Sequence, residues 1–201
     1  MARRRSILLA LARVWGYPLW HGVVHSASPQ TVYEDVDWWM QCIDAPDLLR
    51  LNRYSRFVWL SGALPEFRTL VHYRLSAEHP AWRLLLRLVY RPAPTLTLDA
   101  NHIGPGLFIQ HGTASIICAE SIGSHCWINQ MATIAYNAKG RPTLGDGVRV
   151  AVGAVVIGPI TLHDGATVGA NATVVHDVGP GETVVAPLAV PLTSGTGDAP
   201  A

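Results

Sequence analysis

The chain has 201 residues, of which 49% are hydrophobic, so it suits one domain, or a domain with an appendage, around a packed core. Lys and Arg total 15 against 14 Asp and Glu, and the net charge of +1 excludes the basic footprint that nucleic-acid binding needs. The three cysteines, Cys42, Cys118 and Cys126, have no metal-ligand spacing, and such a sparse, odd set indicates a reducing compartment, so we expect a cytoplasmic protein.

Residues 1–30 are predicted to form an N-terminal arm. Three arginines precede an apolar run that resembles the start of a signal peptide, but Arg13 interrupts the run after a few residues. A membrane span asks for about 20 apolar residues, so we expect no stable insertion into a membrane. The favoured interpretation is a helix or arm packed on the protein or on a neighbouring subunit, and a basic segment lying at a membrane surface is the alternative.

Residues 31–94 are predicted to be an α-helical region. Thr31 and Glu34 have the spacing of a capping box, which places a helix start there. Apolar residues at helical spacing predict a second helix over residues 47–60, with Ser61 and Gly62 as its stop.

Two further helices are predicted to begin at prolines, since proline is favoured in the first turn of a helix. Pro65 begins one of them, and Pro80 begins the other. The segment 91–94 contains two prolines and ends helix formation, so we place a domain boundary there.

An aliphatic residue then returns every sixth position, a period that fits neither an α-helix nor a flat strand and therefore indicates an internal repeat. Over the last part of the repeat the positions are Leu144, Val150, Val156, Leu162, Val168 and Val174. Traced backwards they are Ile134, Ile128, Ile122 and Ile116, and then, after one extra residue, Ile109 and Ile103.

This hexapeptide pattern is typical of a parallel β-helix, in which three short strands and three tight corners make one coil. The aliphatic residues point into a narrow shaft, and small residues allow close backbone approach at the corners. Twelve such positions predict about four coils, over residues 95–190. Residues 191–201 are small, polar and proline-containing, and are predicted to be a disordered tail.

The repeat has one longer interruption. Ile134 and Leu144 are ten residues apart instead of six, so a loop of about four extra residues should leave the coil near residues 137–142. Loops that project from a rigid solenoid are preferred places for function.

His111 is the leading candidate for chemistry, because it follows Ile109 and should project from a corner of the coil. A neutral imidazole in that place can take the proton of an acceptor hydroxyl or amine as it attacks an acyl donor. A solvated surface histidine is the alternative interpretation, and it is favoured for the other corner histidines, His125, His163 and His176.

Several segments resemble the serine acetyltransferase family, and more closely the serine-acetyltransferase-like proteins associated with polysaccharide and secondary-metabolite pathways. They are residues 103–113, which include Gln110-His111-Gly112-Thr113, then Ile128-Asn129-Gln130, Thr133, and residues 142–148; residues 65–75 resemble the helical segment before the repeats. The likeness covers about residues 60 to 186.

The resemblance implies a left-handed parallel β-helix, an exception to the usual right-handed crossover. It implies an acyltransferase that forms a homotrimer or a dimer of trimers, uses acetyl-CoA, needs no metal, and employs His111 as general base. By residue matching, the acceptor would be bound by Gln110, Asn129 and Arg141. The pantetheine arm and cleft would be lined by Ala135, Tyr136, Gly153, Ala154, Gly169 and Ala170.

The departures from the family also carry information. The aspartate that orients the family's histidine is Leu96 here, and Asp99, Glu120 and a backbone carbonyl are candidates to replace it. A second aspartate, next to the histidine, is Gln110, and a second histidine in the loop is Arg141, which can meet a carboxylate or phosphate. The cationic C-terminal motif is absent, and free L-serine is therefore not favoured as acceptor.

We therefore predict an O- or N-acyltransferase that moves acetyl from acetyl-CoA to a hydroxyl of a small amino-acid-like or sugar acceptor in a specialised pathway. One alternative is an enzyme acting on a carrier-bound substrate, or a non-catalytic trimeric scaffold. Another is a zinc hydrolyase, since γ-type carbonic anhydrases share the repeat, but that activity needs three converging histidines and the repeat histidines are widely spaced.

Overall fold

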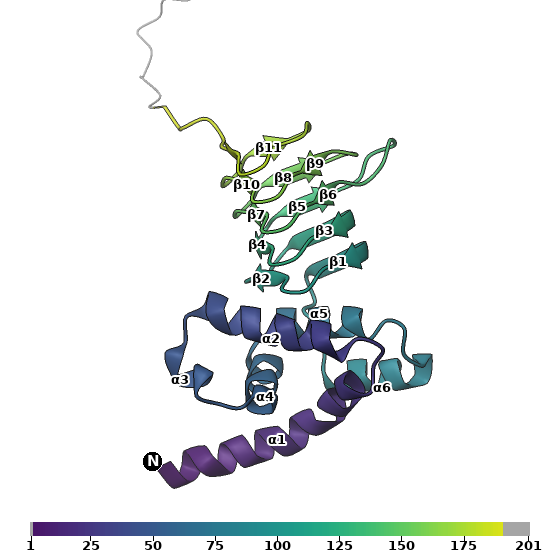
Figure 1. Cartoon of the computed structure of the whole chain (residues 1–201), viewed down its shortest axis with the longest axis vertical. Coiled ribbons are helices and arrows are strands. Elements are labelled where there is room, and N and C mark those ends of the chain that lie inside the picture. Colours follow the sequence, from purple (N-terminus) through teal and green to yellow (C-terminus); the bar gives the residue numbers. More distant parts are fainter. Residues whose placement is uncertain (1, 191–201) are drawn as a thin grey trace, which may run out of the picture.

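The computed structural model describes residues 2–190 and consists of a helical region on which a parallel β-helix stands (Figure 1). The predicted disordered tail, residues 191–201, lies outside the described residues. The helices are α1 (Ala2–Val24), α2 (Pro29–Ile43), α3 (Pro46–Leu49), α4 (Arg53–Ala63), α5 (Pro65–Arg74) and α6 (Pro80–Val89). None of the helices in the described part of the chain is long and apolar enough to cross a membrane.

The helices begin partly where the sequence predicts. Those expected at Pro65 and Pro80 do begin at these residues. The prediction that a helix starts with a capping box at Thr31 is wrong, because α2 already begins at Pro29, after Ser28. The single helix over 47–60 is also wrong: a break separates α3 from α4, and the side chain of Asn52 accepts the backbone N–H of Ser55 to cap the second of them.

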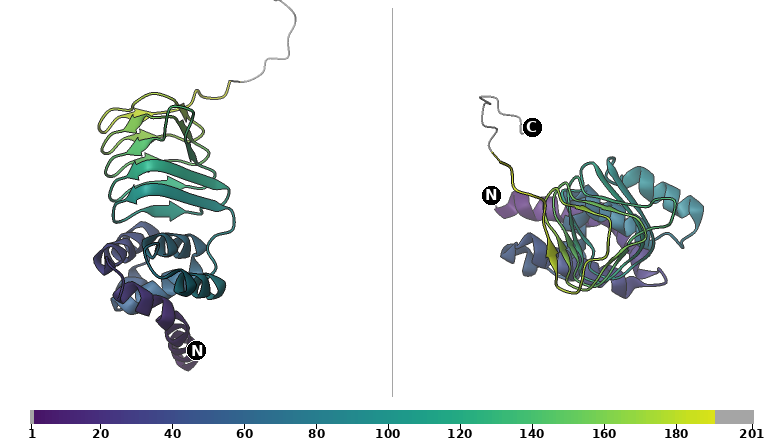
Figure 2. Two further views of the ribbon diagram at one scale, coloured as in Figure 1. Left: turned by 90° about the vertical axis from the view of Figure 1, so that its right-hand side faces the viewer. Right: turned by 90° about the horizontal axis from the view of Figure 1, so that it is seen from above.

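Within residues 2–190, twelve strands form two parallel sheets of seven and five strands. The larger sheet contains β1 (Leu96–Ile103), β3 (Ser115–Ile122), β5 (Thr133–Ala135), β6 (Thr143–Leu144), β8 (Val155–Ile157), β9 (Thr161–Leu162) and β11 (Thr173–Val174). The smaller contains β2 (Phe108–Gln110), β4 (Trp127–Asn129), β7 (Arg149–Val150), β10 (Thr167–Val168) and β12 (Thr183–Val184). Viewed from above, successive coils lie over one another around a common shaft (Figure 2).

The coil number is about five, one more than the sequence predicts. Leu98 pairs in register with Ile117, and it begins the stack one repeat unit before Ile103, the first predicted shaft residue. At the other end, Val178 stacks on Leu162 and Val184 on Val168, so the repeat continues beyond Val174. These terminal positions escape the strict six-residue count because Leu98 lies five residues before Ile103 and Val178 four residues after Val174.

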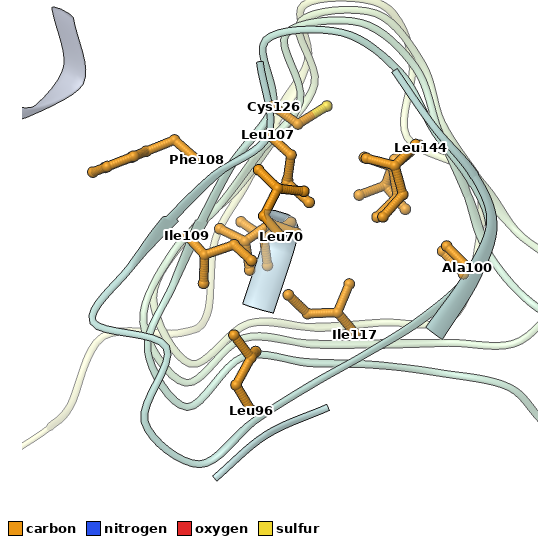
Figure 3. Packing of buried hydrophobic residues seen from close by; sticks show 14 of the residues in the cluster. Leu70, Leu96, Ala100, Leu107, Phe108, Ile109, Ile117, Cys126 and Leu144 are labelled. Carbon is orange, nitrogen blue, oxygen red and sulfur yellow. The ribbon is translucent and has the colours of Figure 1, made fainter. Parts of the chain in front are cut away.

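The register of the second coil also differs from the prediction. Ile117 is fully buried in the shaft, whereas Ile116, the predicted shaft residue, is 44% exposed. Ile117 lies eight residues after Ile109 and five before Ile122, so the first corner is two residues longer and the next interval one residue shorter. Figure 3 shows Ile117 and Ile109 pointing into the shaft, while Phe108 points outwards.

A buried ion pair joins the β-helix to the helical region. Arg74 of α5 binds Asp35 of α2 at 2.9 Å, and both side chains are almost fully buried. The same arginine donates to the carbonyls of Ile103 and Gly104, and Asp35 accepts the backbone N–H of Gly106 at 2.7 Å. Burial raises the pKa of the Asp35 carboxyl, and Arg74 offsets part of this rise. The first coil is thus held to two helices through backbone groups that would otherwise lack hydrogen-bond partners.

Aromatic side chains form the rest of this junction. The indole N–H of Trp39 donates to the carbonyl of Leu107 at 2.7 Å, and its ring packs edge-on against Phe108 and Phe67 at centroid distances of 4.8 and 5.2 Å. Aromatic edge-to-face pairs of this kind add to the stabilisation by burial. Together with the ion pair, they fix the position of α2 beside β2.

The predicted loop is present between β5 and β6 and projects from the stack (Figure 1). Asn137 and Gly140 pair as an antiparallel bridge, with their backbone N–H groups donating to each other's carbonyls at 3.0 and 3.2 Å. The Asn137 side chain accepts the N–H of Lys139 at 2.8 Å. The loop is therefore a tight hairpin.

Candidate active site

His111 lies exposed at the corner that follows β2, in the first coil. Its backbone is left-handed, with φ +51°, a conformation that few residues other than glycine adopt. Later coils turn this corner with one left-handed residue each, Met131, Gly153 and Asn171, whereas the first coil uses two, His111 and Ala114. The longer corner accounts for the register difference and marks the histidine position as locally unusual.

A cavity of about 270 Å³ lies beside His111, between the β-helix and the helical region. Its lining comes from α2, α4, the start of α5 and the first coil: Trp39, Cys42, Ile43, Trp59, Leu64, Glu66, Phe108, Ile109, Gln110 and His111. Most of these side chains are apolar or aromatic, as in ordinary small-molecule pockets. Burial raises the pKa of the Cys42 thiol to about 12, so it is neutral at physiological pH. The ionisable groups left in the lining are Glu66 and His111.

Gly112 brings the histidine corner into close contact with α5. A Cβ atom at this position would lie 2.9 Å from Cγ of Glu66, 2.9 Å from Cγ2 of Ile109 and 3.2 Å from Cδ2 of Leu96. Glycine is needed here for space. Glu66 and Leu96 therefore flank the residue that follows His111, one from a helix and one from the first strand.

Gln110, predicted to bind the acceptor, borders this cavity and also a second one of about 210 Å³ on the outer face of β2, β4 and β7. Its side-chain oxygen accepts the indole N–H of Trp127 at 3.1 Å. Asn129 lines the second cavity only, together with Arg149, whose guanidinium lies 5.7 Å from the centre of the Trp127 ring. Gln110 and Asn129 are thus neighbours in successive coils.

Arg141 is not brought to His111 within one chain. It lies in the hairpin loop and pairs with the carboxylate of Asp99 at 3.0 Å, with its guanidinium 5.6 Å from the centre of the Tyr136 ring. Asp99 is thereby engaged elsewhere, and Glu120 accepts a hydrogen bond from Asn101 at 3.0 Å. Neither of the carboxylates suggested by the sequence as partner for the histidine lines its cavity.

The positions predicted to line a pantetheine arm lie at two corners of the coil. Gly153 and the pair Gly169 and Ala170 stand in the same column of corners as His111, in later coils. Both glycines also have a packing reason, since a Cβ atom would lie 2.3 Å from Oδ1 of Asn171 at the first and 3.0 Å from Cγ1 of Val185 at the second. The side chain of Ala154 is buried inside the shaft. The remaining two, Ala135 and Tyr136, end β5 and lead into the hairpin loop.

The sequence pattern does not identify most of the cavity lining. Trp39, Trp59 and Glu66 come from the helical region and meet the first coil only through tertiary packing. The available signal was Glu66 itself, an acidic residue directly after the helix-starting Pro65. In the described part of the chain, no group of three or more His, Cys, Asp or Glu side chains is arranged to hold a metal ion.

No family model matches the chain, but individual relatives do. A serine acetyltransferase of Helicobacter pylori is 38% identical over 140 residues, which cover 64% of this chain and 82% of that protein. A serine acetyltransferase of Mycobacterium tuberculosis is 34% identical over 120 residues, which cover 53% of this chain and 52% of that protein.

Solved structures agree on the fold. The crystal structure of serine acetyltransferase from Brucella abortus superimposes with a TM-score of 0.62 at 18% identity, covering 81% of this chain and 68% of that one. The enzyme of Neisseria gonorrhoeae in complex with serine gives 0.59 at 22% identity, covering 90% and 83%. The β-helix is therefore of the left-handed kind. With a relative matched over most of its length, the chain belongs to the serine acetyltransferase family and is an acyltransferase of that type.

Proposed function

We propose that the protein transfers an acetyl group from acetyl-CoA to a hydroxyl of a small acceptor, with His111 as general base. The observation that carries the proposal is the exposed imidazole at the edge of an apolar cavity, in a chain of the serine acetyltransferase family.

In the proposed reaction, neutral His111 takes the proton of the acceptor hydroxyl while the oxygen attacks the carbonyl carbon of the thioester. The carbonyl oxygen becomes an oxyanion in a tetrahedral intermediate, which backbone N–H groups are suited to stabilise. When the intermediate collapses, the carbon–sulfur bond breaks, and the imidazolium returns its proton to the leaving thiolate. General-base assistance of this kind contributes about 100- to 10,000-fold in rate.

The acceptor side of the proposal rests on the cavity lining. Trp39, Trp59 and Phe108 offer apolar and aromatic faces, against which the carbon face of a sugar or the body of an amino-acid-like molecule can pack. Gln110 would supply a polar contact in this cavity, and Asn129 in the neighbouring one. Such a lining favours an acceptor other than free L-serine, and hence a specialised pathway.

We also propose that the active site is completed in a homotrimer. Ile116, Met131 and Tyr136 are large apolar side chains that lie exposed on the β-helix. An apolar surface of this kind is expected to be covered by a partner. A neighbouring subunit would also bring a second copy of Arg141 and the hairpin loop into reach of a cleft. The three free cysteines accord with a cytoplasmic location.

The test is thiol release from acetyl-CoA, measured with serine, homoserine, amino sugars and a carrier-bound acceptor. At least one acceptor should support turnover by the wild-type protein, and His111→Ala should reduce kcat by at least about 100-fold without loss of the fold by circular dichroism.

The matched control is His125→Ala, which removes another exposed corner histidine with a left-handed backbone (φ +56°). This variant should retain the wild-type rate. Near-full activity of His111→Ala would contradict the general-base role, and no thiol release with any acceptor would favour a scaffold.

A further inference from the structure

We propose that Glu66 is the positioning residue that orients the imidazole of His111; the inference rests on the general-base role proposed above. It assigns a function to a side chain of the helical region, whereas the sequence directs attention to carboxylates of the β-helix.

The first argument is location. Glu66 stands in the first turn of α5 and lines the same cavity as His111. The Cγ atom of Glu66 lies next to Gly112, the residue that follows His111: a Cβ atom added at Gly112 would be 2.9 Å from it. The Glu66 carboxylate can therefore reach the cavity side of the corner from a rigid helix.

Glu66 also lies close to the position from which an orienting aspartate would act. Leu96, at the position where an orienting aspartate is expected from the family resemblance, touches the same point: an added Cβ at Gly112 would lie 3.2 Å from its Cδ2 atom. Glu66 and Leu96 thus both lie next to Gly112. A carboxylate lost from the first strand is replaced by one that enters from α5.

The Glu66 carboxylate has no hydrogen-bond partner among the groups that the structure describes. The side chain is partly buried, yet it makes no hydrogen bond or ion pair with the side chains and backbone groups that the structure describes. The charge of Arg68, on the same helix, does act on Glu66, but the Arg68 guanidinium gives its hydrogen bonds to the carbonyls of Arg91 and Ser61, at 2.7 and 2.6 Å. A partly buried carboxylate facing apolar side chains gains from a cationic or donating partner.

His111 is the partner that the cavity offers. The other titratable group in the lining, Cys42 of α2, is neutral because burial raises its pKa to about 12, and Arg149 lies towards the second cavity. A carboxylate that accepts one imidazole N–H fixes the tautomer with the other nitrogen free as base, and it stabilises the imidazolium once the proton has moved.

The experiment uses the full chain and whichever acceptor supports turnover in the thiol-release assay. Glu66→Gln keeps the shape and removes the charge, and we expect kcat to fall by about 10- to 1,000-fold. Because a nearby negative charge raises the pKa of an imidazole, its loss should move the acid limb of the kcat/KM profile to lower pH. Glu66→Asp should keep the wild-type acid limb and lose less activity. Glu120→Gln, a carboxylate outside the cavity, should match the wild type.

A rescue variant tests whether a carboxylate at position 96 can replace the one at position 66. Leu96→Asp added to Glu66→Gln should restore part of the lost rate and return the acid limb towards its wild-type pH. Thermal melting checks that each variant folds, and Glu66→Ala, which removes the same carboxylate, carries the test should Glu66→Gln lose its fold.

Two outcomes would overturn the proposal. A rise in the acceptor KM with unchanged kcat and an unchanged acid limb would make Glu66 an acceptor-binding residue. Wild-type kinetics of Glu66→Gln would leave it no role, and the proposed function would still stand if His111→Ala is inactive. Loss of the general-base role itself is seen separately, as full activity of His111→Ala.

Discussion

Gly112 shows how the absence of one side chain sets the geometry of the cavity. Its neighbours belong to α5, β2 and β1, so the corner can approach the helix only because no Cβ atom is present. The adjacent His111 and the first turn of α5 owe their proximity to this contact. The positions of the proposed base, His111, and of the Glu66 carboxylate are therefore coupled through a residue that has no side chain.

Gly112→Ala should destabilise the protein and misplace the corner. The added methyl group would lie 2.9 Å from carbon atoms of Glu66 and Ile109, closer than side chains approach, so the helix or the coil must shift. Overpacking of this kind costs about 1–3 kcal/mol. Urea denaturation measures the loss, and kcat should fall with it.

The matched control is Gly179→Ala, where the added Cβ atom would meet one side chain, that of Glu182, with Oε2 at 3.3 Å and Cβ at 4.0 Å. Its effect on the free energy of unfolding should be within about 0.5 kcal/mol. Equal destabilisation by both substitutions would show that the close contact at Gly112 is not what lowers the free energy of unfolding.

At the residue scale, the six-residue period predicts that His111 stands at a corner of the coil, and the structure places it there. The period selects Ile116 where Ile117 is buried, since a corner with two left-handed residues shifts the count and no residue type announces it. The period does not indicate Glu66, because the contact between α5 and the first coil depends on tertiary packing.

At the scale of elements, α5 carries a buried histidine as well as Glu66. His72 Nε2 lies 2.7 Å from the carbonyl oxygen of Tyr90, so this nitrogen carries the proton and donates. Burial lowers the pKa of His72, and the nearby cations Arg87, Arg68 and Arg83 lower it further against the effect of the Tyr90 carbonyl. The neutral imidazole thus ties the end of α6 to α5.

This lowered pKa predicts acid sensitivity. In the unfolded chain a histidine protonates near its ordinary pKa of about 6.5, whereas the folded protein resists protonation until lower pH. The unfolded state therefore binds more protons in this window, and the stabilisation from His72 is lost as the pH falls below about 6.5. Each unit by which the pKa is lowered corresponds to about 1.4 kcal/mol at full effect.

Urea denaturation at pH 7.5 and 5.5 checks this prediction. His72→Gln can still donate to the Tyr90 carbonyl but cannot titrate, so its free energy of unfolding should fall less between the two pH values than that of the wild type. The same fall in both proteins would assign the acid sensitivity to other groups.

The helices also show which local signals can be trusted. Pro65 and Pro80 begin helices as predicted, because the fixed φ of proline suits a first turn. The helix predicted over 47–60 is divided because Asn52 prefers to cap α4, and apolar spacing alone does not reveal that preference. The strands were predictable as a class, since each is one unit of a repeat.

At the scale of the whole molecule, the period predicted the β-helix but not how the helical region closes its first coil. The buried pair of Asp35 and Arg74, from two helices, satisfies backbone groups of the corner between β1 and β2. Nothing in the spacing of either residue indicates that they meet. Pairing between distant segments is the part of a fold that local pattern leaves open.

The proposed trimer makes a prediction about mass. Three chains of 21.8 kDa give about 65 kDa, and two trimers give about 131 kDa. Sedimentation equilibrium should yield one of these values, and Tyr136→Asp together with Met131→Asp should shift the protein towards monomer. A wild-type protein of about 22 kDa at micromolar concentration would contradict the trimer.

The cavity beside His111 is built from the helical region and the first coil alone, at one end of a stack of about five. In a repeat protein each unit contacts chiefly its neighbours, so units can be gained or lost at the far end without disturbing the first. Under the proposed function, the wall that receives the extended donor can therefore lengthen or shorten by whole coils while the cavity beside His111 stays the same. Selection of the proposed acceptor and accommodation of the proposed donor are then separately adjustable.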